Sequence, residues 1–412
     1  MHRILFISHN ATLTGAPMVL LNLLKWLKQN TNSEIILFVN DAGYDGGKLL
    51  EKFSEVAETY LIEKMTDHEL YNLLASKKID LIFSNTIVNI HLLNKIYNVL
   101  QVPHICFVHE LESVIKECRG LKENIEWVNE NTDMFLACSE AVKENLIKNN
   151  GIQPEKINII QEFIEIKKYE PQTINNATAQ LRSKLNIPGD TLVLGVVGAM
   201  QWRKGHDLLL PIANSLKAKN LSFRLLAVGV DATTDPIMYE RVSGDIEKAG
   251  LKNHVTLIPP DLEIDKYYNL FDVFLMLSRE DPFPLVNLHA ASFGCPVLCW
   301  DKSGGSPDFV ETDCGFVIDY LNIDQLVEKV SLLASNPELR KQLGQAGKTK
   351  VESKNSMQVQ SPVVNKLMDA AIQKGPYVKF SERKLEFNNE IANKGEKSVK
   401  SYLKKMIGSV NS

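Results

Sequence analysis

Two neighbouring cations, Arg203 and Lys204, precede Gly205 in the second half of the sequence. They follow the apolar run 191–197, which predicts a strand buried on both faces. Guanidinium and ammonium groups at such a junction can neutralise a diphosphate. A solvated Arg-Lys pair is the simpler alternative, but it explains less well why the pair stands between a strand and a helix. We therefore expect a diphosphate site here.

A predicted helix start follows the strand-like run 273–277. Asp281 comes after this run, and Pro284 favours the first turn of a helix. The amides of Leu285 and Val286 would then lack partners inside the helix and would attract an anion. The carboxylate of Asp281 would then lie beside the expected anion site.

The first half of the sequence has two weaker candidates. Gly15 follows the strand-like run 3–8 and precedes a helical pattern, so backbone amides could approach a ligand closely. The turn lacks the glycine fingerprint of dinucleotide-binding proteins, which argues against a nicotinamide cofactor. His109 ends the run 104–108 and could donate to a ligand oxygen or carry a proton near neutral pH. A histidine satisfied by nearby backbone is an equally good reading.

Short apolar runs alternate with helical patterns along most of the chain, which predicts repeated βαβ units. We expect an α/β protein with two Rossmann-like domains, whose ligands bind beyond the carboxyl ends of the strands. The expected strands are 3–8, 34–39, 80–84, 104–108, 133–139, 156–161, 191–197, 223–228, 254–258, 273–277, 296–299 and 315–318. The expected parts are an N-terminal domain over 1–165, a linker over 166–190, a C-terminal domain over 191–355, and helices with a charged tail over 356–412.

Composition bounds the class of protein. The 412 residues are 44% hydrophobic and 23% charged, with a net charge of −4, so we expect a folded protein without a nucleic-acid partner. No apolar run reaches the roughly 18 residues of a membrane span. The six cysteines lack metal-type spacing, and a cytoplasmic location is expected. The tail clusters Lys397, Lys400, Lys404 and Lys405, which could bind the inner face of an anionic membrane or form a solvated helix.

Together these segments resemble the retaining glycosyltransferases of family 4, over roughly residues 1–355. The stretch 278–296 resembles the acidic motif of that family, with Asp281 at its first acidic position. Arg203, Lys204 and Gly205 resemble the basic diphosphate loop. The Gly304-Gly305 turn resembles a Gly-Gly turn of the family, and Gly15 its amino-terminal glycine loop.

The resemblance implies the GT-B fold, in which two Rossmann-like domains face a central cleft. It implies that Gly15, Arg203, Lys204, Leu285 and Val286 hold the diphosphate of the donor. His109, Asp281 and Lys204 would be the catalytic residues.

The nucleotide and its ribose would lie at His289, Gly304 and Gly305. The sequence differs from the family pattern at two positions. His289 occupies the second acidic position of the motif, and Ala199 occupies a position at which the family usually has an arginine. A neutral imidazole can hydrogen-bond a hydroxyl but lacks the two acceptor oxygens of a carboxylate.

The expected activity is transfer of a sugar, with retention of configuration, from a UDP- or GDP-linked donor to a glycan or lipid-linked acceptor in polysaccharide biosynthesis. Cations and a helix start can stabilise the leaving diphosphate, so neither a metal nor a further cofactor is expected. The alternatives are an epimerase or phosphorylase of the same fold, or a non-catalytic protein that binds nucleotide sugars or a partner.

Overall fold

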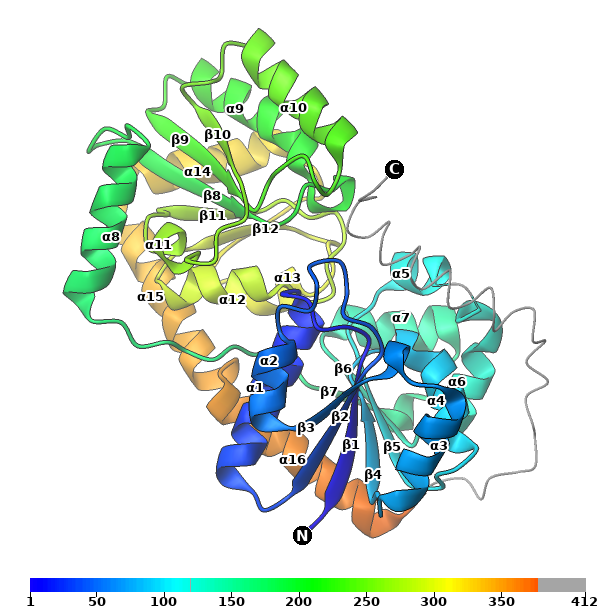
Figure 1. Ribbon diagram of the computed structural model, residues 1–412. Coiled ribbons are helices and arrows are strands. Elements are labelled where there is room, and N and C mark those ends of the chain that lie inside the picture. Colours follow the sequence, from blue (N-terminus) through cyan, green and yellow to red (C-terminus); the bar gives the residue numbers. More distant parts are fainter. Residues whose placement is uncertain (119, 377–412) are drawn as a thin grey trace. The chain divides into compact units, whose positions relative to one another are not determined.

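The computed structural model describes residues 1–118 and 120–376, which form two compact units (Figure 1). The first unit comprises Met1–Glu165 together with the helix that begins at Met357. The second comprises Ile166–Ser356. Each unit is built on one parallel sheet with helices packed on it.

The first unit has a seven-stranded sheet in the order β3-β2-β1-β4-β5-β6-β7. Its strands are β1 (Arg3–Ser8), β2 (Glu34–Val39), β3 (Glu58–Leu61), β4 (Leu81–Ser84), β5 (His104–Val108), β6 (Met134–Ala137) and β7 (Ile157–Ile159). The strand order reverses between β1 and β4, so the loops after these two strands diverge and leave room for a ligand.

The helices of the first unit connect successive strands. They are α1 (Gly15–Asn30), α2 (Leu50–Val56), α3 (Asp67–Ser76), α4 (Ile90–Tyr97), α5 (Glu112–Glu117), α6 (Ile125–Asn131), α7 (Glu140–Asn150) and, from the far end of the chain, α16 (Met357–Lys374). Helix α16 packs against α1, β4 and β5. It therefore completes the cover of the sheet.

The second unit has a six-stranded sheet in the order β10-β9-β8-β11-β12-β13, which reverses between β8 and β11. Its strands are β8 (Leu192–Val197), β9 (Phe223–Val228), β10 (Val255–Ile258), β11 (Val273–Met276), β12 (Val297–Trp300) and β13 (Gly315–Ile318). Its helices are α8 (Pro171–Lys184), α9 (Leu209–Ala218), α10 (Pro236–Lys248), α11 (Asp265–Tyr268), α12 (Leu285–Ser292), α13 (Ser306–Val310), α14 (Ile323–Ser335) and α15 (Pro337–Lys354).

Apolar strands drive the formation of both cores. Residues 4–7 of β1 and 273–276 of β11 are all buried, as expected for central strands with helices on both faces. Burial of each large apolar side chain stabilises the fold by roughly 1.5–3 kcal/mol. The sheets can therefore hold polar loops at their carboxyl edges.

Every apolar run predicted as a strand contains one, and the α/β class is confirmed. Strand β3 was not expected, because its sequence Glu-Thr-Tyr-Leu lacks the continuous apolar character of a central strand and β3 lies at an edge. The expected linker 166–190 contains α8, which packs on α11 within the second unit. Residues 357–374, expected among the C-terminal helices of 356–412, return to the first unit as α16.

Within the described residues, no helix is long and apolar enough to cross a membrane. The basic cluster of the tail lies outside the described residues.

His104 gives the fold a measurable dependence on pH. It is 1% exposed, and its Nε2 and Nδ1 lie 2.8 Å and 3.2 Å from the hydroxyls of Ser84 and Thr132. Burial lowers the pKa of His104 to about 3, so the folded protein binds fewer protons than the unfolded chain. Its contribution is present above the unfolded pKa of about 6.5 and is lost as pH falls towards 3.

We expect the free energy of unfolding to fall between pH 6.5 and 4.5, by roughly 2 kcal/mol from His104. Urea unfolding of the parent and of His104→Gln at several pH values measures this contribution. The variant should show a weaker pH dependence, although other buried histidines still contribute. Identical pH dependence in both proteins would contradict the assignment.

Candidate active site

The second unit joins Lys204 and Asp281 in an ion pair. The Lys204 Nζ donates to the Asp281 Oδ2 at 2.5 Å, and the Arg203 Nη1 lies 4.0 Å from the same oxygen. The side chain of Asp281 is 8% exposed and that of Lys204 is 23% exposed. This places two cations and one carboxylate at the reversal of strand order between β8 and β11.

Backbone hydrogen bonds tie the two loops of this pair together. The amide of Arg279 donates to the carbonyl of Arg203 at 2.8 Å, and the Arg203 guanidinium donates to the carbonyl of Glu280 at 2.6 Å. Gly205 closes the turn with a φ of 75°. A Cβ at Gly205 would lie 2.1 Å from the carbonyl oxygen of Leu277, so only glycine permits this approach.

The glycine turn after β12 docks directly on Asp281. The amide of Asp281 donates to the carbonyl of Ser303 at 2.7 Å, and the amide of Gly305 donates to the carbonyl of Asp281 at 3.0 Å. Gly304 has a φ of 107° and forms a parallel bridge with Asp281. Arg203, Lys204, Asp281, Gly304 and Gly305 are thus brought together.

Burial and neighbouring charges act in opposite directions on Lys204. Burial lowers the pKa of Lys204, Asp281 raises it in part, and Arg203 lowers it again, so the pKa lies below the ordinary value. An anion bound beside the ammonium would favour its charged form. Because the ammonium has three N–H groups, its bond to Asp281 leaves capacity for phosphate oxygens.

Helix α12 begins at Leu285, as expected, with Pro284 at the N-cap. Proline has no side-chain acceptor, so the first-turn amides of Leu285 and Val286 are not capped by it. Asn287 in the same turn donates to the Ser306 hydroxyl at 3.1 Å and so links α12 to α13. The helix start is therefore fixed in position and suited to an anion.

His289, expected to contact the nucleotide, lies on the face of α12 that packs on α11. Its ring stacks on Tyr268, with centroids 5.7 Å apart and an angle of 21° between the planes. Burial lowers the pKa of His289 to about 4, so its imidazole is neutral at pH 7. The assignment of His289 to the ribose stays a prediction.

Sequence reasoning missed the support of the basic loop by Arg279. Its guanidinium makes two bonds of 2.8 and 2.7 Å to the Asp207 carboxylate, and it lies 4.4 Å from the centroid of the Trp202 ring. Trp202 is 65% exposed. The sequence did contain a signal for this contact, because Arg279 follows a predicted strand and Asp207 lies shortly after the basic pair.

In the first unit, Gly15 is the first residue of α1. The Asn85 Nδ2 donates to the carbonyl of Ala16 at 2.8 Å, which ties the first turn of α1 to the end of β4. This turn lies at the reversal of strand order between β1 and β4.

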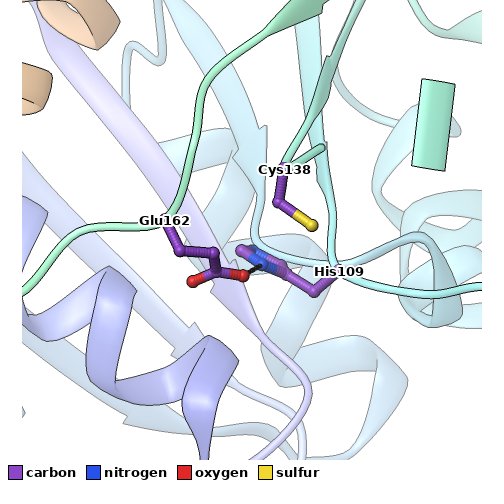
Figure 2. A group of neighbouring side chains, drawn as sticks. All are labelled: His109, Cys138 and Glu162. Atoms are coloured by element: carbon purple, nitrogen blue, oxygen red, sulfur yellow. Dashed lines mark hydrogen bonds and ion pairs between the residues drawn. The ribbon is translucent and has the colours of Figure 1, made fainter. Parts of the chain in front are cut away.

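His109 follows β5 and has partners at both ring nitrogens, of which Figure 2 shows Glu162. Its Nδ1 lies 2.7 Å from the Glu162 Oε1, and its Nε2 lies 3.1 Å from the Asn85 Oδ1. Burial alone lowers the pKa of His109, but the carboxylates of Glu162 and Glu110 outweigh burial and raise it above its ordinary value. When His109 is protonated, its ring donates from both nitrogens.

The surroundings of His109 are strongly polar for a buried position. Thr86 has a φ of 149°, which is strained for a β-branched residue, and its hydroxyl donates to the Glu110 carboxylate. Burial raises the pKa of Glu110, although His109 and Thr86 oppose this shift. Burial, together with His109, lowers the pKa of His9 to about 4.

His109, Cys138 and Glu162 carry donor atoms that all lie within 4.8 Å of one another. Figure 2 shows the Cys138 sulfur beside the ring, on the side opposite the backbone of Glu162. The Nδ1–Oε1 contact has the length of a charge-assisted hydrogen bond, so a metal ion would first have to replace that proton. We interpret the group as a hydrogen-bonded pair, and the expected absence of a metal stays a prediction.

The candidate residues therefore form two groups, one at the carboxyl edge of each sheet. Two parallel sheets with covering helices, each with polar loops at its point of strand reversal, define the GT-B class of α/β proteins. The fold is similar to that of Anabaena HepE in complex with UDP and glucose, with a TM-score of 0.75 at 17% identity over 90% of this chain and all of that one. Sucrose-phosphate synthase from Thermosynechococcus elongatus gives 0.72 at 18% identity, over 91% of this chain and all of that one.

Sequence comparison specifies the family. The model of the group 1 glycosyl transferases matches residues 177–350, and that of glycosyltransferase family 4 matches residues 15–168. The chain belongs to the group 1 glycosyltransferases of family 4.

Curated relatives are distant and only partly covered. The capsular polysaccharide biosynthesis glycosyltransferase CapM of Staphylococcus aureus is 25% identical over 60% of this chain and 65% of its own length. A D-inositol 3-phosphate glycosyltransferase of Segniliparus rotundus is 26% identical over 52% of this chain and 47% of its own length. The chain thus aligns with about half to two thirds of these relatives.

Replacement of Gly205 should disrupt the basic loop. Gly205→Ala places a Cβ against the backbone of Leu277 and a side chain at positive φ, and we expect a loss of about 3 kcal/mol in the free energy of unfolding. The matched control is Gly244→Ala, inside α10, where nothing lies within 4 Å of the added Cβ. The control should gain about 0.5–1 kcal/mol.

Urea unfolding of both variants and the parent measures these effects. Equal stability of Gly205→Ala and the parent would show that the close approach to Leu277 is not required.

Proposed function

We propose that the protein is a retaining glycosyltransferase that moves a sugar from a nucleoside-diphosphate donor to a glycan or lipid-linked acceptor. The observation that carries the proposal is the meeting of Arg203, Lys204 and Asp281 beside the start of α12. Membership in the group 1 glycosyltransferases supports the same reaction class.

The proposed role of the basic loop is to stabilise the leaving diphosphate. Negative charge develops on the phosphate oxygen as the glycosidic bond breaks, and preorganised cations stabilise that charge most. Arg203 and Lys204 are held by Glu280 and Asp281, so they need little reorganisation when the donor binds. The amides of Leu285 and Val286 would add neutral donors, and Gly15 would admit the diphosphate to the backbone of α1.

These cations supply the charge that a metal would otherwise provide, so we propose a metal-independent reaction without a further cofactor. Retention of configuration would place the acceptor on the same face as the leaving group. The departing diphosphate oxygen would then take the acceptor's proton. Asp281 and His109 are proposed to contact the donor sugar, and His289, Gly304 and Gly305 its nucleotide.

We propose a UDP-linked donor before a GDP-linked one, supported by structures of similar fold in complex with UDP and with UDP-glucose. A role in polysaccharide assembly is supported by the distant likeness to the capsular protein of Staphylococcus aureus. Membrane association through the tail and a cytoplasmic location remain parts of the proposal without a structural test.

A donor screen tests the reaction. Purified protein is incubated with UDP-, GDP- and ADP-sugars, with and without glycan acceptors and with a chelator, and the released nucleoside diphosphate is measured. We expect release that depends on the acceptor and persists with the chelator. Tight binding of a nucleoside diphosphate without any release would instead indicate a non-catalytic binding protein.

Lys204→Ala should weaken binding of the diphosphate. Loss of a charge-assisted bond costs about 1.5–3 kcal/mol, so we expect UDP to bind ~10- to 100-fold more weakly, with turnover reduced by orders of magnitude. Calorimetry with UDP and the release assay measure the two effects. Near-parental values for both would refute the role of Lys204.

Two further variants make the Lys204 result interpretable. Lys204→Ala leaves the buried Asp281 without its ammonium, so the double variant with Asp281→Asn separates loss of binding from loss of stability. Lys252→Ala removes an exposed lysine that pairs with Glu247, and it should bind UDP like the parent.

A further inference from the structure

A continuous hydrogen-bonded path runs from Glu162 to the first turn of α1 in the first unit. Glu162 follows β7, His109 follows β5, Asn85 follows β4, and Ala16 lies in α1. The links are 2.7 Å from Glu162 to His109, 3.1 Å from His109 to Asn85 and 2.8 Å from Asn85 to the carbonyl of Ala16. Residues from four separate elements are thereby joined.

The direction of each bond is fixed by chemistry. The carbonyl of Ala16 can only accept, so the Asn85 NH₂ group must donate to it and the Asn85 Oδ1 must accept from the His109 Nε2. With its oxygen towards His109, Asn85 turns its NH₂ group towards the carbonyl of Ala16. The ring of His109 therefore meets the oxygen of the same amide whose NH₂ group bonds to α1.

Burial makes this path stronger than a surface network. The side chains of His109 and Glu162 are each 5% exposed, so water competes little for their bond. Asn85 is fully buried. A buried polar path of this kind holds its members in one arrangement, because each unmade bond would cost about 1–3 kcal/mol.

We propose that Glu162 is a positioning residue: its carboxylate fixes the ring of His109, and through Asn85 it holds the first turn of α1 in the shape that receives the donor. The role in donor binding rests on the proposed function. The positioning itself concerns only the first unit and can be tested without a substrate.

Other groups around His109 do not replace Glu162. The Glu110 carboxylate is occupied by Thr86 and by the amides of Ile87 and His109. His9, at the end of β1, is neutral because burial and His109 lower its pKa to about 4.

On the remaining side, Cys138 follows β6 and offers a thiol, a much weaker acceptor than a carboxylate (Figure 2). Glu162 is therefore the carboxylate that bonds directly to the ring, whereas Glu110 acts on the ring only through its charge. The raised pKa of His109 agrees with this arrangement.

Glu162→Gln removes the charge while keeping the shape. The glutamine amide can donate to Nδ1 of a neutral imidazole, whose Nε2–H still reaches Asn85. Glu162→Ala removes the contact altogether and frees the ring to rotate. Glutamine should therefore change the titration of His109 and spare the position of α1, whereas alanine should change both.

Two matched controls lie close to Glu162. Glu165→Gln removes a carboxylate three residues further along the same segment, where Glu165 pairs with Lys25 at 2.6 Å. Cys138→Ser alters the other neighbour of the ring without removing a charge. Neither control should shift the titration of His109.

The first measurement is the titration of His109 in the full chain by NMR with labelled histidine, assigned through His109→Gln. We expect a pKa above 6.5 in the parent and both controls, and a fall of at least one unit in Glu162→Gln. An unchanged pKa in Glu162→Gln would overturn the proposal.

The second measurement is hydrogen exchange of the amides of the first turn of α1. We expect exchange at least tenfold faster in Glu162→Ala, near-parental exchange in Glu162→Gln, and no change in Glu165→Gln. Parental exchange in Glu162→Ala would refute the positioning role. Urea unfolding of each variant separates local opening from global loss of stability.

The third measurement is the affinity for UDP. If the positioning supports donor binding, Glu162→Ala should bind ~10-fold more weakly and Glu162→Gln should retain most of the affinity. Parental affinity in Glu162→Ala would refute the link to the donor. If the parent itself binds no nucleotide, the proposed function fails, whereas titration and exchange still decide the positioning role.

Discussion

The ion pair of Lys204 and Asp281 determines how the loops at the carboxyl edge of the second sheet are arranged. Both residues come from loops that diverge where the strand order reverses, and a buried carboxylate is tolerated there only beside a cation. The turn at Gly304 and Gly305 is fixed to the backbone of the same Asp281. The ion pair and these backbone hydrogen bonds together hold three loops at the carboxyl edge of the sheet.

The first unit also buries charged groups at the carboxyl edge of its sheet, but with different side chains. Its sheet edge holds the imidazole ring of His109 between the carboxylate of Glu162 and the amide of Asn85. The side chains of Arg203 and Lys204 in the second unit remain partly exposed, whereas those of His109 and Glu162 in the first unit are almost completely buried.

The sequence predicted much of the second site because Lys204, Asp281 and Gly304 each follow a strand of one parallel sheet, and such strand ends share an edge. It did not predict Glu162, because its meeting with His109 depends on the order β5-β6-β7 and on the direction of two side chains. The sequence also could not predict the orientation of the His289 ring, because that ring stacks on Tyr268 from the separate helix α11.

The path of the chain has a consequence for how the molecule is made. The first unit is discontinuous, because α16 returns to pack on α1, β4 and β5 after the whole second unit has been passed. During synthesis the sheet of residues 3–159 therefore lacks part of its apolar cover until α16 has left the ribosome. Fragments that stop before Met357 would expose that uncovered hydrocarbon surface and would be prone to aggregate.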